Sequence, residues 1–299
     1  MFSRKKLVVV TFVLVLAVIM SALPSLGATF RNRVISDQQF LDLCKQGDAN
    51  AVMKALKSGS SANTKDKEGR SALMYASAYG NVETVNALIR EGADVTHYGG
   101  ASIIHAAAHG NSEIIEVLIQ NGADVNTKNN SGTTALMLSS REGYVASVTV
   151  LLKAGAEVNA RNNNGWTALM YASENGYAEV VKALINAQAD VNIQNERNNS
   201  GEASLGGRTA VMLAAKNGHT EIAEALIDAG ADDKFDNKGK TALIHAAESG
   251  NSETVSLLVH AGSYVKQIDA DGKTVLDYAR KNPKVVGTPI FHYIEQLSK

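Results

Sequence analysis

Two histidines four residues apart are the first candidates for chemistry in this chain of 299 residues. His105 and His109 stand in the segment HAAAH, and residues with this spacing share one face of a helix. Two imidazole rings on one face can bind a zinc ion, which also needs further ligands. Glu142 matches His109 in a later, similar segment, but no third ligand is evident. We therefore expect no metal ion and no cofactor, and interpret the two histidines as a polar pair at a surface edge.

The remaining residues lack the motifs of known catalytic sites. The sequence contains no HExxH, no GxSxG, no phosphate-binding loop and no GxGxxG after a strand. Its single cysteine, Cys44, occupies the place that Ser77 and Ser173 hold in similar segments, inside an expected helix. A small core residue fits this position better than a nucleophile does. We expect that the protein is not an enzyme.

The composition permits a globular or an elongated fold and argues against nucleic-acid binding. Apolar residues make up 45% of the chain and aromatic residues only 5%, so a core must be built from Ala, Leu, Val and Ile. The formal charge is −1, and basic residues are not interleaved with aromatic ones. Such a chain has no general attraction for nucleic acid. A lone cysteine excludes a disulfide within the chain, so packing must hold the fold together.

The first 28 residues have the layout of a secretory signal peptide. Arg4, Lys5 and Lys6 precede an apolar run of 14 residues, and small residues follow up to Gly27 and Ala28. The run is short for a membrane span, which needs about 20 residues. We expect cleavage near Gly27 or Ala28, in a bacterial style of export to the periplasm or out of the cell. The alternative is an uncleaved segment that anchors the protein in the inner membrane.

A repeated segment dominates the rest of the sequence. TALMYASENG, at 167–176, has close copies that begin at Ser71, Thr134, Thr209 and Thr241. Seven glycines that end such segments are spaced by 33, 30, 33, 33, 42 and 32 residues. They are Gly47, Gly80, Gly110, Gly143, Gly176, Gly218 and Gly250. A fixed period near 33 residues is typical of an array of stacked repeats.

Each period contains two helical patterns. Thr167 is the natural N-cap of the quoted segment, since its hydroxyl can accept a hydrogen bond from an unpaired backbone N–H. Ala168 and Leu169 fall on an apolar face, and Gly176 ends the helix. A second helix is expected over 178–187, followed by the polar link ADVNIQNERNN.

The order of these elements resembles the ankyrin repeat, over nearly all of the chain after residue 37. Each unit has a helix, a tight turn, a second helix, the segment GADVN and then DxxGxTAL. The resemblance implies an all-α solenoid of helix–turn–helix repeats with finger loops and degenerate caps at both ends. It divides the chain into a signal peptide (1–28) and an ankyrin-repeat domain (29–299). The expected units of that domain are an N-terminal cap repeat (37–65), six repeats (66–98, 99–128, 129–161, 162–194, 195–235 and 236–268) and a C-terminal cap (269–299).

Two repeats depart from the pattern. Repeat 99–128 has three residues fewer before Ala101, which cannot cap a helix, so its finger loop HYGGAS should be short or distorted. Repeat 195–235 has nine extra residues, within Asn195 to Gly207. Insertions in such arrays map to one loop face, often the binding face. A loop without a binding role is the alternative.

Ankyrin-like proteins usually meet their partners with the finger tips and the last turn of the first helices, along a concave groove. The resemblance therefore implies that this chain binds another protein through positions of these two kinds, and we expect it to be a monomer. The candidate partner-binding residues are Lys67, Arg70, Tyr79, Tyr98, His109, Arg141, Asn163, Trp166, Glu174, Asn175, Arg208, Lys238 and Lys240.

The finger segments are basic relative to the rest of the chain. Their formal charges sum to +5, while loss of residues 1–28 changes the net charge from −1 to −4, so the remainder carries −9. We expect a basic finger edge that favours an acidic partner surface and speeds encounter at low salt. Scattered, solvated lysines are the alternative. Trp166, the one tryptophan, is favoured as an interface residue, with packing against the next finger as its alternative.

The sequence predicts a non-catalytic binding protein and leaves several roles open. The first hypothesis is a scaffold or inhibitor that acts on an enzyme or envelope protein in the periplasm. The second is a secreted effector that engages a host or competitor protein. The third, a membrane-tethered scaffold, applies if the N-terminal segment stays uncleaved.

Overall fold

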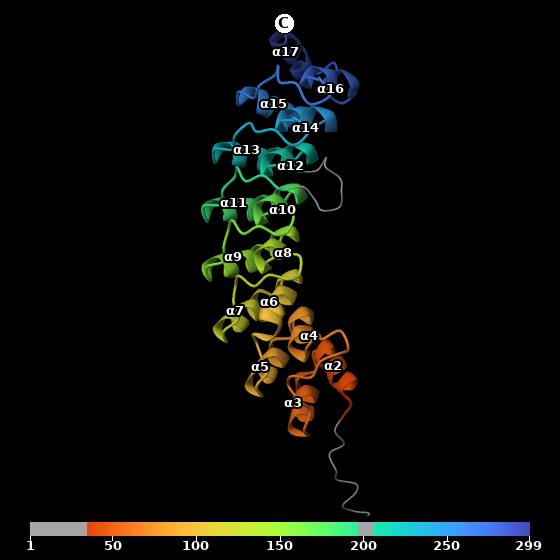
Figure 1. Ribbon diagram of the computed structural model, residues 1–299, viewed down its shortest axis with the longest axis vertical. Helices are drawn as coiled ribbons and strands as arrows, with labels where there is room; N and C mark the ends of the chain where they lie inside the picture. Colours follow the sequence, from red (N-terminus) through yellow and green to blue (C-terminus); the bar gives the residue numbers. More distant parts are fainter. Residues whose placement is uncertain (1–34, 197–205) are drawn as a thin grey trace, which may run out of the picture.

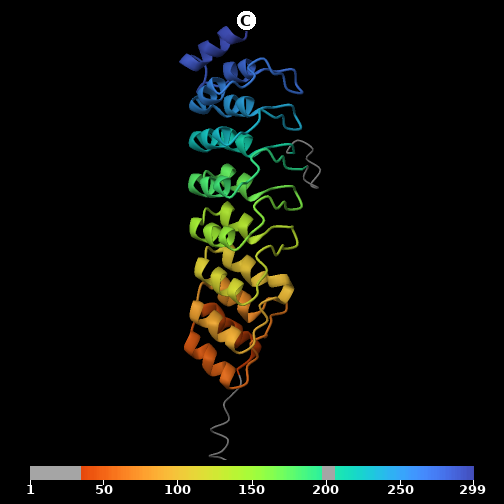
Figure 2. The same ribbon diagram turned by 90° about the vertical axis from the view of Figure 1, so that its left-hand side faces the viewer.

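Paired helices stack into a long, curved column (Figures 1 and 2). The computed structural model describes residues 35–196 and 206–299, apart from the side chains of 97–99. These residues form 16 α-helices and no β-strand; two isolated bridges join Lys65 to Ser71 and Lys128 to Thr134. The prediction of an all-α repeat solenoid is confirmed. The predicted signal peptide lies outside the described residues.

Each repeat contributes one inner and one outer helix, and the two kinds form separate layers (Figure 1). The inner helices are α2 (Asp37–Gln46), α4 (Ala72–Tyr79), α6 (His97–Ala108), α8 (Ala135–Arg141), α10 (Ala168–Asn175), α12 (Ala210–Asn217), α14 (Ala242–Ser249) and α16 (Val275–Lys281). The outer helices are α3 (Ala49–Lys57), α5 (Val82–Arg90), α7 (Ser112–Gln120), α9 (Val145–Lys153), α11 (Ala178–Asn186), α13 (Thr220–Asp228), α15 (Ser252–His260) and α17 (Pro289–Leu297). None of these helices is both long and apolar enough to cross a membrane.

The capping residues of the repeated segment act as predicted. The side chain of Thr167 accepts a hydrogen bond from the N–H of Met170, and Gly176 ends α10 with φ of 82°. Ala168 and Leu169 are buried in an apolar core that runs from repeat to repeat through the described chain. Because each helix pair buries only part of its apolar surface by itself, the stack is the stable unit.

The turn glycine of each repeat lies against a side chain of the following repeat. A Cβ atom on Gly143 would lie 2.5 Å from Cδ1 of Tyr177, and a Cβ on Gly110 would lie 2.9 Å from Tyr144. The same place is taken in the other repeats by Asn81, Asn111, His219, Asn251 and Asn282. The turn thus needs glycine for its backbone conformation and also for the close approach of the next repeat.

Repeat 99–128 lacks a finger loop altogether. Helix α6 begins at His97, immediately after the turn that ends the preceding repeat, and has 12 residues. Helices α4 and α10 have 8 residues each and begin only after their fingers. In place of the short or distorted finger that the sequence predicts, the segment is helical, because the shortened link continues directly into α6.

The inserted segment of repeat 195–235 is described only at its two ends. Asn195 donates its N–H to the carbonyl of Arg208, and Gly207 donates its N–H to the carbonyl of Asn195, so the base of the insertion closes like the other fingers. Residues 197–205 lie outside the described residues. The binding role expected for the insertion therefore stays a prediction.

Replacement of the turn glycine should cost more where the next repeat covers it. Gly143→Ala places a methyl group against Tyr177, so we expect the free energy of unfolding to fall by about 2–4 kcal/mol. Gly155 has a similar φ of 84°, but a Cβ there meets no atom within 4 Å. Gly155→Ala is therefore the control, with an expected loss of about 1–2 kcal/mol from backbone strain alone. Urea unfolding followed by circular dichroism measures both, and equal losses would contradict the packing argument.

Gln188 stands where the other repeats have glycine, and its backbone conformation is strained. Substitution by glycine should remove this strain. Its φ of 63° makes it the one non-glycine residue with positive φ in the described part of the chain. We expect Gln188→Gly to raise the free energy of unfolding by about 1 kcal/mol, because the left-handed conformation disfavours a side chain. The reverse change, Gly155→Gln, should lower it by a similar amount. Loss of stability on Gln188→Gly would show that the glutamine side chain contributes more than its backbone strain costs.

Candidate binding surface

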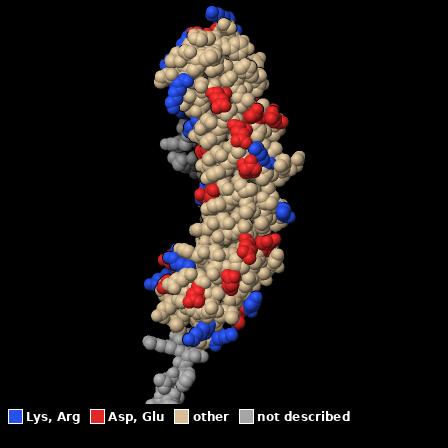
Figure 3. All heavy atoms as spheres, turned by 180° about the vertical axis from the view of Figure 1, so that it is seen from behind, with Lys and Arg blue, Asp and Glu red and all other residues tan. Residues whose placement is uncertain are grey.

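The inner helices and the finger loops together form the concave side of the column. Figure 3 shows the molecule from behind, curved toward the side on which the inner helices lie. Figure 2 shows the fingers projecting in a row from the ends of these helices. This side brings together segments that are about one repeat apart in the sequence, so it can contact a partner along many repeats at once.

One Asp or Asn side chain shapes each finger turn. In the finger 234–240, Oδ1 of Asp236 accepts hydrogen bonds from the N–H groups of Lys238 (2.8 Å) and Lys240 (2.9 Å). Asn129, Asn162 and Asp269 accept from the two matching N–H groups of their own fingers. Asp and Asn favour such turns because their short side chains can reach the backbone two and four residues on.

The same finger side chain often bonds to the inner helix, nine residues further along the chain. This bond fixes the finger relative to the groove, because its two ends belong to a turn and to a packed helix. The pairs and their distances are Asp66–Tyr75 (2.7 Å), Asn162–Tyr171 (2.9 Å), Asp236–His245 (2.9 Å) and Asp269–Tyr278 (2.5 Å).

These contacts shift the pKa values of the finger carboxylates. Burial acts to raise the pKa of Asp66, but hydrogen bonds from Tyr75 and Arg70 outweigh it and hold the pKa at about 2. The pKa values of Asp236 and Asp269 are also lowered, against burial, by hydrogen bonds from His245 and Tyr278 and from finger N–H groups. The three fingers built on Asp66, Asp236 and Asp269 therefore depend on ionised carboxylates.

Backbone hydrogen bonds join neighbouring fingers into a ladder. The N–H of Asn163 donates to the carbonyl of Ser131 over 3.0 Å, which ties the finger 160–166 to the finger 127–133. Matching bonds run from Glu196 to Asn164, from Asn237 to Gly206 and from Ala270 to Lys238. Among the described residues, these bonds connect the fingers 127–133, 160–166, 234–240 and 266–273 and the two ends of the insertion into one edge.

The structure places the predicted partner-binding residues in four groups. Exposed are Lys67, Arg70, Tyr79, His109, Arg141, Asn163, Asn175 and Lys238. Half-buried are Trp166, Glu174 and Arg208. Lys240 is buried, and the side chain of Tyr98 lies outside those that the structure describes.

Lys240, predicted as a partner-binding residue of a basic finger edge, does not present its charge at the surface. Its side chain is only 10% exposed, and Nζ lies 2.6 Å from a carboxylate oxygen of Glu248 on α14. Nζ also lies 4.6 Å from the ring centroid of Tyr278, in the following repeat. The long stem of a lysine can lie along a packed surface. Here the charge pairs with Glu248 of the same repeat and lies against the ring of Tyr278 in the next one.

Other finger cations are partly neutralised as well. Nε of Arg70 lies 2.6 Å from Asp66, and a second nitrogen of its guanidinium lies 3.2 Å from Glu68. By contrast, Lys67 and Lys238 are exposed and have no side-chain ion pair within the described residues. A basic edge is therefore carried by fewer side chains than the formal charge suggests.

Trp166 packs within its own repeat. Its ring centroid lies 4.9 Å from that of Tyr171 on α10, with an angle of 38° between the planes. Trp166 is half-buried. The interface role predicted for Trp166 stays a prediction.

An aromatic cluster marks the N-terminal end of the groove. Tyr79 is 54% exposed, and its ring stacks at 6.5 Å on that of His109 in the next repeat. Nζ of Lys45 lies 5.3 Å from the same ring of Tyr79. Exposed tyrosine is frequent at the energetic centres of protein interfaces.

Glu174 lies at the end of α10 among side chains of the next repeat. Burial raises the pKa of its carboxyl, while the charges of Lys216 and Arg208 act to lower it. Its backbone carbonyl accepts hydrogen bonds from Asn217 and from the ring of His219. Next to it, Asn175 donates to the carbonyl of Tyr171 and stays exposed.

His105 and His109 do not converge on a common ligand. The Nδ1 atom of His109 lies 3.0 Å from the backbone oxygen of His105. Burial, followed by the charges of His109 and Arg70, lowers the pKa of His105. No group of three or more His, Cys, Asp or Glu residues that could hold a metal ion occurs in the described ranges. Cys44 is buried, which raises the pKa of its thiol to about 12 and disfavours the reactive thiolate.

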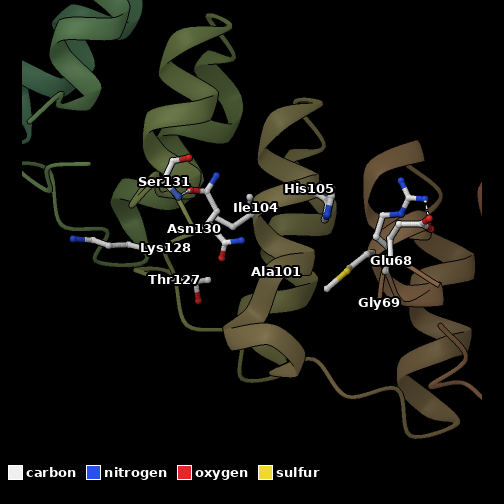
Figure 4. Close-up of a pocket in the computed structure, with 12 residues that line it drawn as sticks. Glu68, Gly69, Ala101, Ile104, His105, Thr127, Lys128, Asn130 and Ser131 are labelled. Carbon is white, nitrogen blue, oxygen red and sulfur yellow. Dashed lines mark hydrogen bonds and ion pairs between the residues drawn. The ribbon is translucent and has the colours of Figure 1, made fainter. Parts of the chain in front are cut away.

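A cavity of about 510 Å³ lies where repeat 99–128 has no finger. Figure 4 shows Glu68 and Gly69 on one side and Thr127, Lys128, Asn130 and Ser131 on the other. Ala101, Ile104 and His105 of α6 lie between them. The cavity is therefore a gap in the row of fingers, with an inner helix as its floor.

Sequence reasoning missed two exposed apolar residues of the C-terminal fingers. Phe235 is 50% exposed and Ile268 is 57% exposed, each immediately before the finger aspartate. The signal was present, because that position holds Lys65, Lys128, Arg161 and Gln194 in other repeats. These residues make the C-terminal fingers less polar than the N-terminal ones.

Comparison with known proteins gives one family. A family model described as ankyrin repeats, in three copies, matches residues 40–129, 104–195 and 196–269. No curated protein matches the chain.

The carboxylate of Asp66 should stabilise the protein only while it is ionised. Its pKa of about 2 lies below the value of about 4 expected in the unfolded chain, so its contribution is present above about pH 4 and is lost toward pH 2. We expect Asp66→Asn to be less stable than the parent near pH 6 and equally stable near pH 2. Urea unfolding at both values measures the difference. A difference that persists undiminished near pH 2 would contradict this role.

Proposed function

The chain belongs to the ankyrin-repeat family, and from that premise we propose that it is a non-catalytic scaffold or inhibitor that binds a protein through its concave groove and fingers. Ankyrin repeats are generally scaffolds for protein–protein interaction. An extended groove and a row of loops suit a large partner surface.

The observation that carries the proposal is the bonding of the fingers. Asp or Asn side chains tie several finger turns to inner helices, and backbone bonds tie the fingers from 127 to 273 to each other. A surface whose loops are already ordered loses little conformational entropy when it binds. The fingers are thus prepared for a partner, which a set of independent loops would not be.

Charge supports a partner with an acidic surface. Lys67 and Lys238 are exposed on the fingers, while the outer helices α7 and α13 carry Glu113, Glu116, Glu221, Glu224 and Asp228. In the view of Figure 3, Asp and Glu side chains gather toward the outer helices. A partner with negative charge would therefore be steered to the finger side.

The place of action follows from the N-terminal segment and is part of the proposal. Residues 1–28 have the pattern of a secretory signal, which supports action in the periplasm or outside the cell. A secreted effector that engages a host or competitor protein is the second candidate, and it rests on the same pattern. An uncleaved segment would make the protein a membrane-tethered scaffold instead.

Expression of the full chain with its own N-terminus separates these roles. The mass of the purified protein reports cleavage near Gly27 or Ala28, and fractionation reports periplasm, medium or membrane. Affinity capture from the cells that make the protein then tests for a partner. Failure to enrich any protein from periplasmic, membrane or culture fractions would contradict the binding role.

Reversal of exposed finger charges should weaken binding to the captured partner. We expect Lys67→Glu, Lys128→Glu and Lys238→Glu together to lower the affinity by about tenfold and to reduce its dependence on salt. Lys54→Glu, Lys57→Glu and Lys153→Glu on the outer helices change the net charge equally and serve as the control. Titration calorimetry at two salt concentrations measures both triple variants. Equal losses for the two would mean that net charge, and not the finger edge, governs binding.

A further inference from the structure

The missing finger interrupts the backbone ladder at one place. Elsewhere, a residue after the finger Asp or Asn donates its N–H to the preceding finger, as Asn163 does to Ser131. By position, Asn130 matches Asn163, and Glu68 matches Ser131. No hydrogen bond from the N–H of Asn130 or to the carbonyl of Glu68 is found among the described residues. Two backbone groups that are paired in other fingers therefore face the gap without a partner.

His105 has also lost the partner that its position has elsewhere. It occupies the place of His245 in repeat 236–268, where Nε2 lies 2.9 Å from the carboxylate of Asp236 in the finger. Tyr75, Tyr171 and Tyr278 at the same place bond to their own finger residues. Repeat 99–128 has no finger to supply such a residue. The ring of His105 forms no hydrogen bond within the described part of the chain and lines the cavity.

The remaining walls of the cavity fit a polar turn with a negative charge. Arg70 and Lys128 contribute positive charge, and Glu68, which pairs with Arg70, contributes a negative one. Met74 and Ile104 give the floor an apolar part. A volume of about 510 Å³ lies within the range of about 300–1,000 Å³ of known ligand sites.

We propose that a turn of the partner protein takes the place of the missing finger, with an Asp or Glu carboxylate against His105. Its backbone donates an N–H to the carbonyl of Glu68 and accepts a hydrogen bond from the N–H of Asn130. The chain's own Asp236–His245 pair and finger ladder supply the geometry of these contacts. Completion of an open edge by backbone bonds, with a side-chain pocket for specificity, is an established mode of peptide recognition. This inference rests on the proposed binding role and names the part of the partner that the groove receives.

A finger of the chain itself supplies a probe. Residues 267–273, QIDADGK, have a net charge of −1 and contain Asp269, which bonds to Tyr278 at the position of His105. A peptide of this sequence, closed head to tail so that the turn is preformed, is titrated into the isotopically labelled full-length protein. We expect saturable NMR shifts of the Asn130 amide and the His105 ring. Absence of such shifts up to about 5 mM peptide, which corresponds to about −3 kcal/mol, overturns the proposal.

Substitutions on both sides test the carboxylate contact. His105→Leu is expected to fold, because Leu138 and Leu213 occupy the same place in other repeats. It should weaken peptide binding by about tenfold, and the peptide with Asp269→Ala should bind the parent protein equally weakly. His260→Leu, at the exposed end of the outer helix α15 and outside this cavity, is the control and should bind within about twofold of the parent. The proposal is overturned if His105→Leu binds the peptide as tightly as the parent does and the parent binds the Asp269→Ala peptide as tightly as the unaltered one.

Three further outcomes separate this inference from others. Sedimentation that shows dimers of the parent, lost in His105→Leu, would mean that a second copy supplies the turn, and would overturn a foreign partner as occupant. If the captured partner binds His105→Leu and the parent protein with equal affinity, the inference is overturned while the binding role stands. Peptide binding at His105 without any captured protein would contradict the binding role, and with it the partner protein as occupant of the cavity.

Discussion

The rest of the structure depends on the close approach of each turn glycine to the following repeat. In the described chain, each of these glycines packs against a side chain of the next repeat. Except at Gly250, that side chain comes directly after the next repeat's own turn glycine, as Tyr177, which packs on Gly143, comes after Gly176. This approach leaves no room for a Cβ atom and brings successive inner helices into one packed layer. It fixes the spacing of the helices, and because finger residues bond to those helices, it also fixes the spacing of the fingers. Local turn chemistry thus determines the geometry of the whole groove.

Departures from the regular spacing change the binding surface. Three missing residues before Ala101 remove one finger, and the consequence reaches beyond that repeat. The backbone groups of Glu68 and Asn130 and the ring of His105 come from three different repeats, yet all are deprived of the same partner. Their gathering at one cavity gives the groove a feature that a uniform array would lack (Figure 4). A repeat protein can acquire a specific site by omission as well as by insertion.

The sequence predicts the fold well because each repeat contains the same residues that begin and end its helices. Thr167 and Gly176 mark the ends of a helix in a single copy, and the period extends the assignment along the chain. The candidate surface is predicted less completely, since exposure depends on neighbours. Lys240 has the same local sequence context as an exposed finger lysine, but Glu248 and Tyr278 bury its charge. The cavity beside His105 follows from an alignment of repeats and from bonds between fingers, which spacing within one repeat cannot show.

The central claim is that the inner helices and fingers, and not the outer helices, form the surface that binds a partner. Hydrogen–deuterium exchange of the full-length protein, with and without its captured partner, tests this most directly. The account predicts slower exchange in the fingers from 64 to 70 and from 127 to 133 and at the start of α6, with little change in α7, α9 and α13. Protection confined to the outer helices would contradict it.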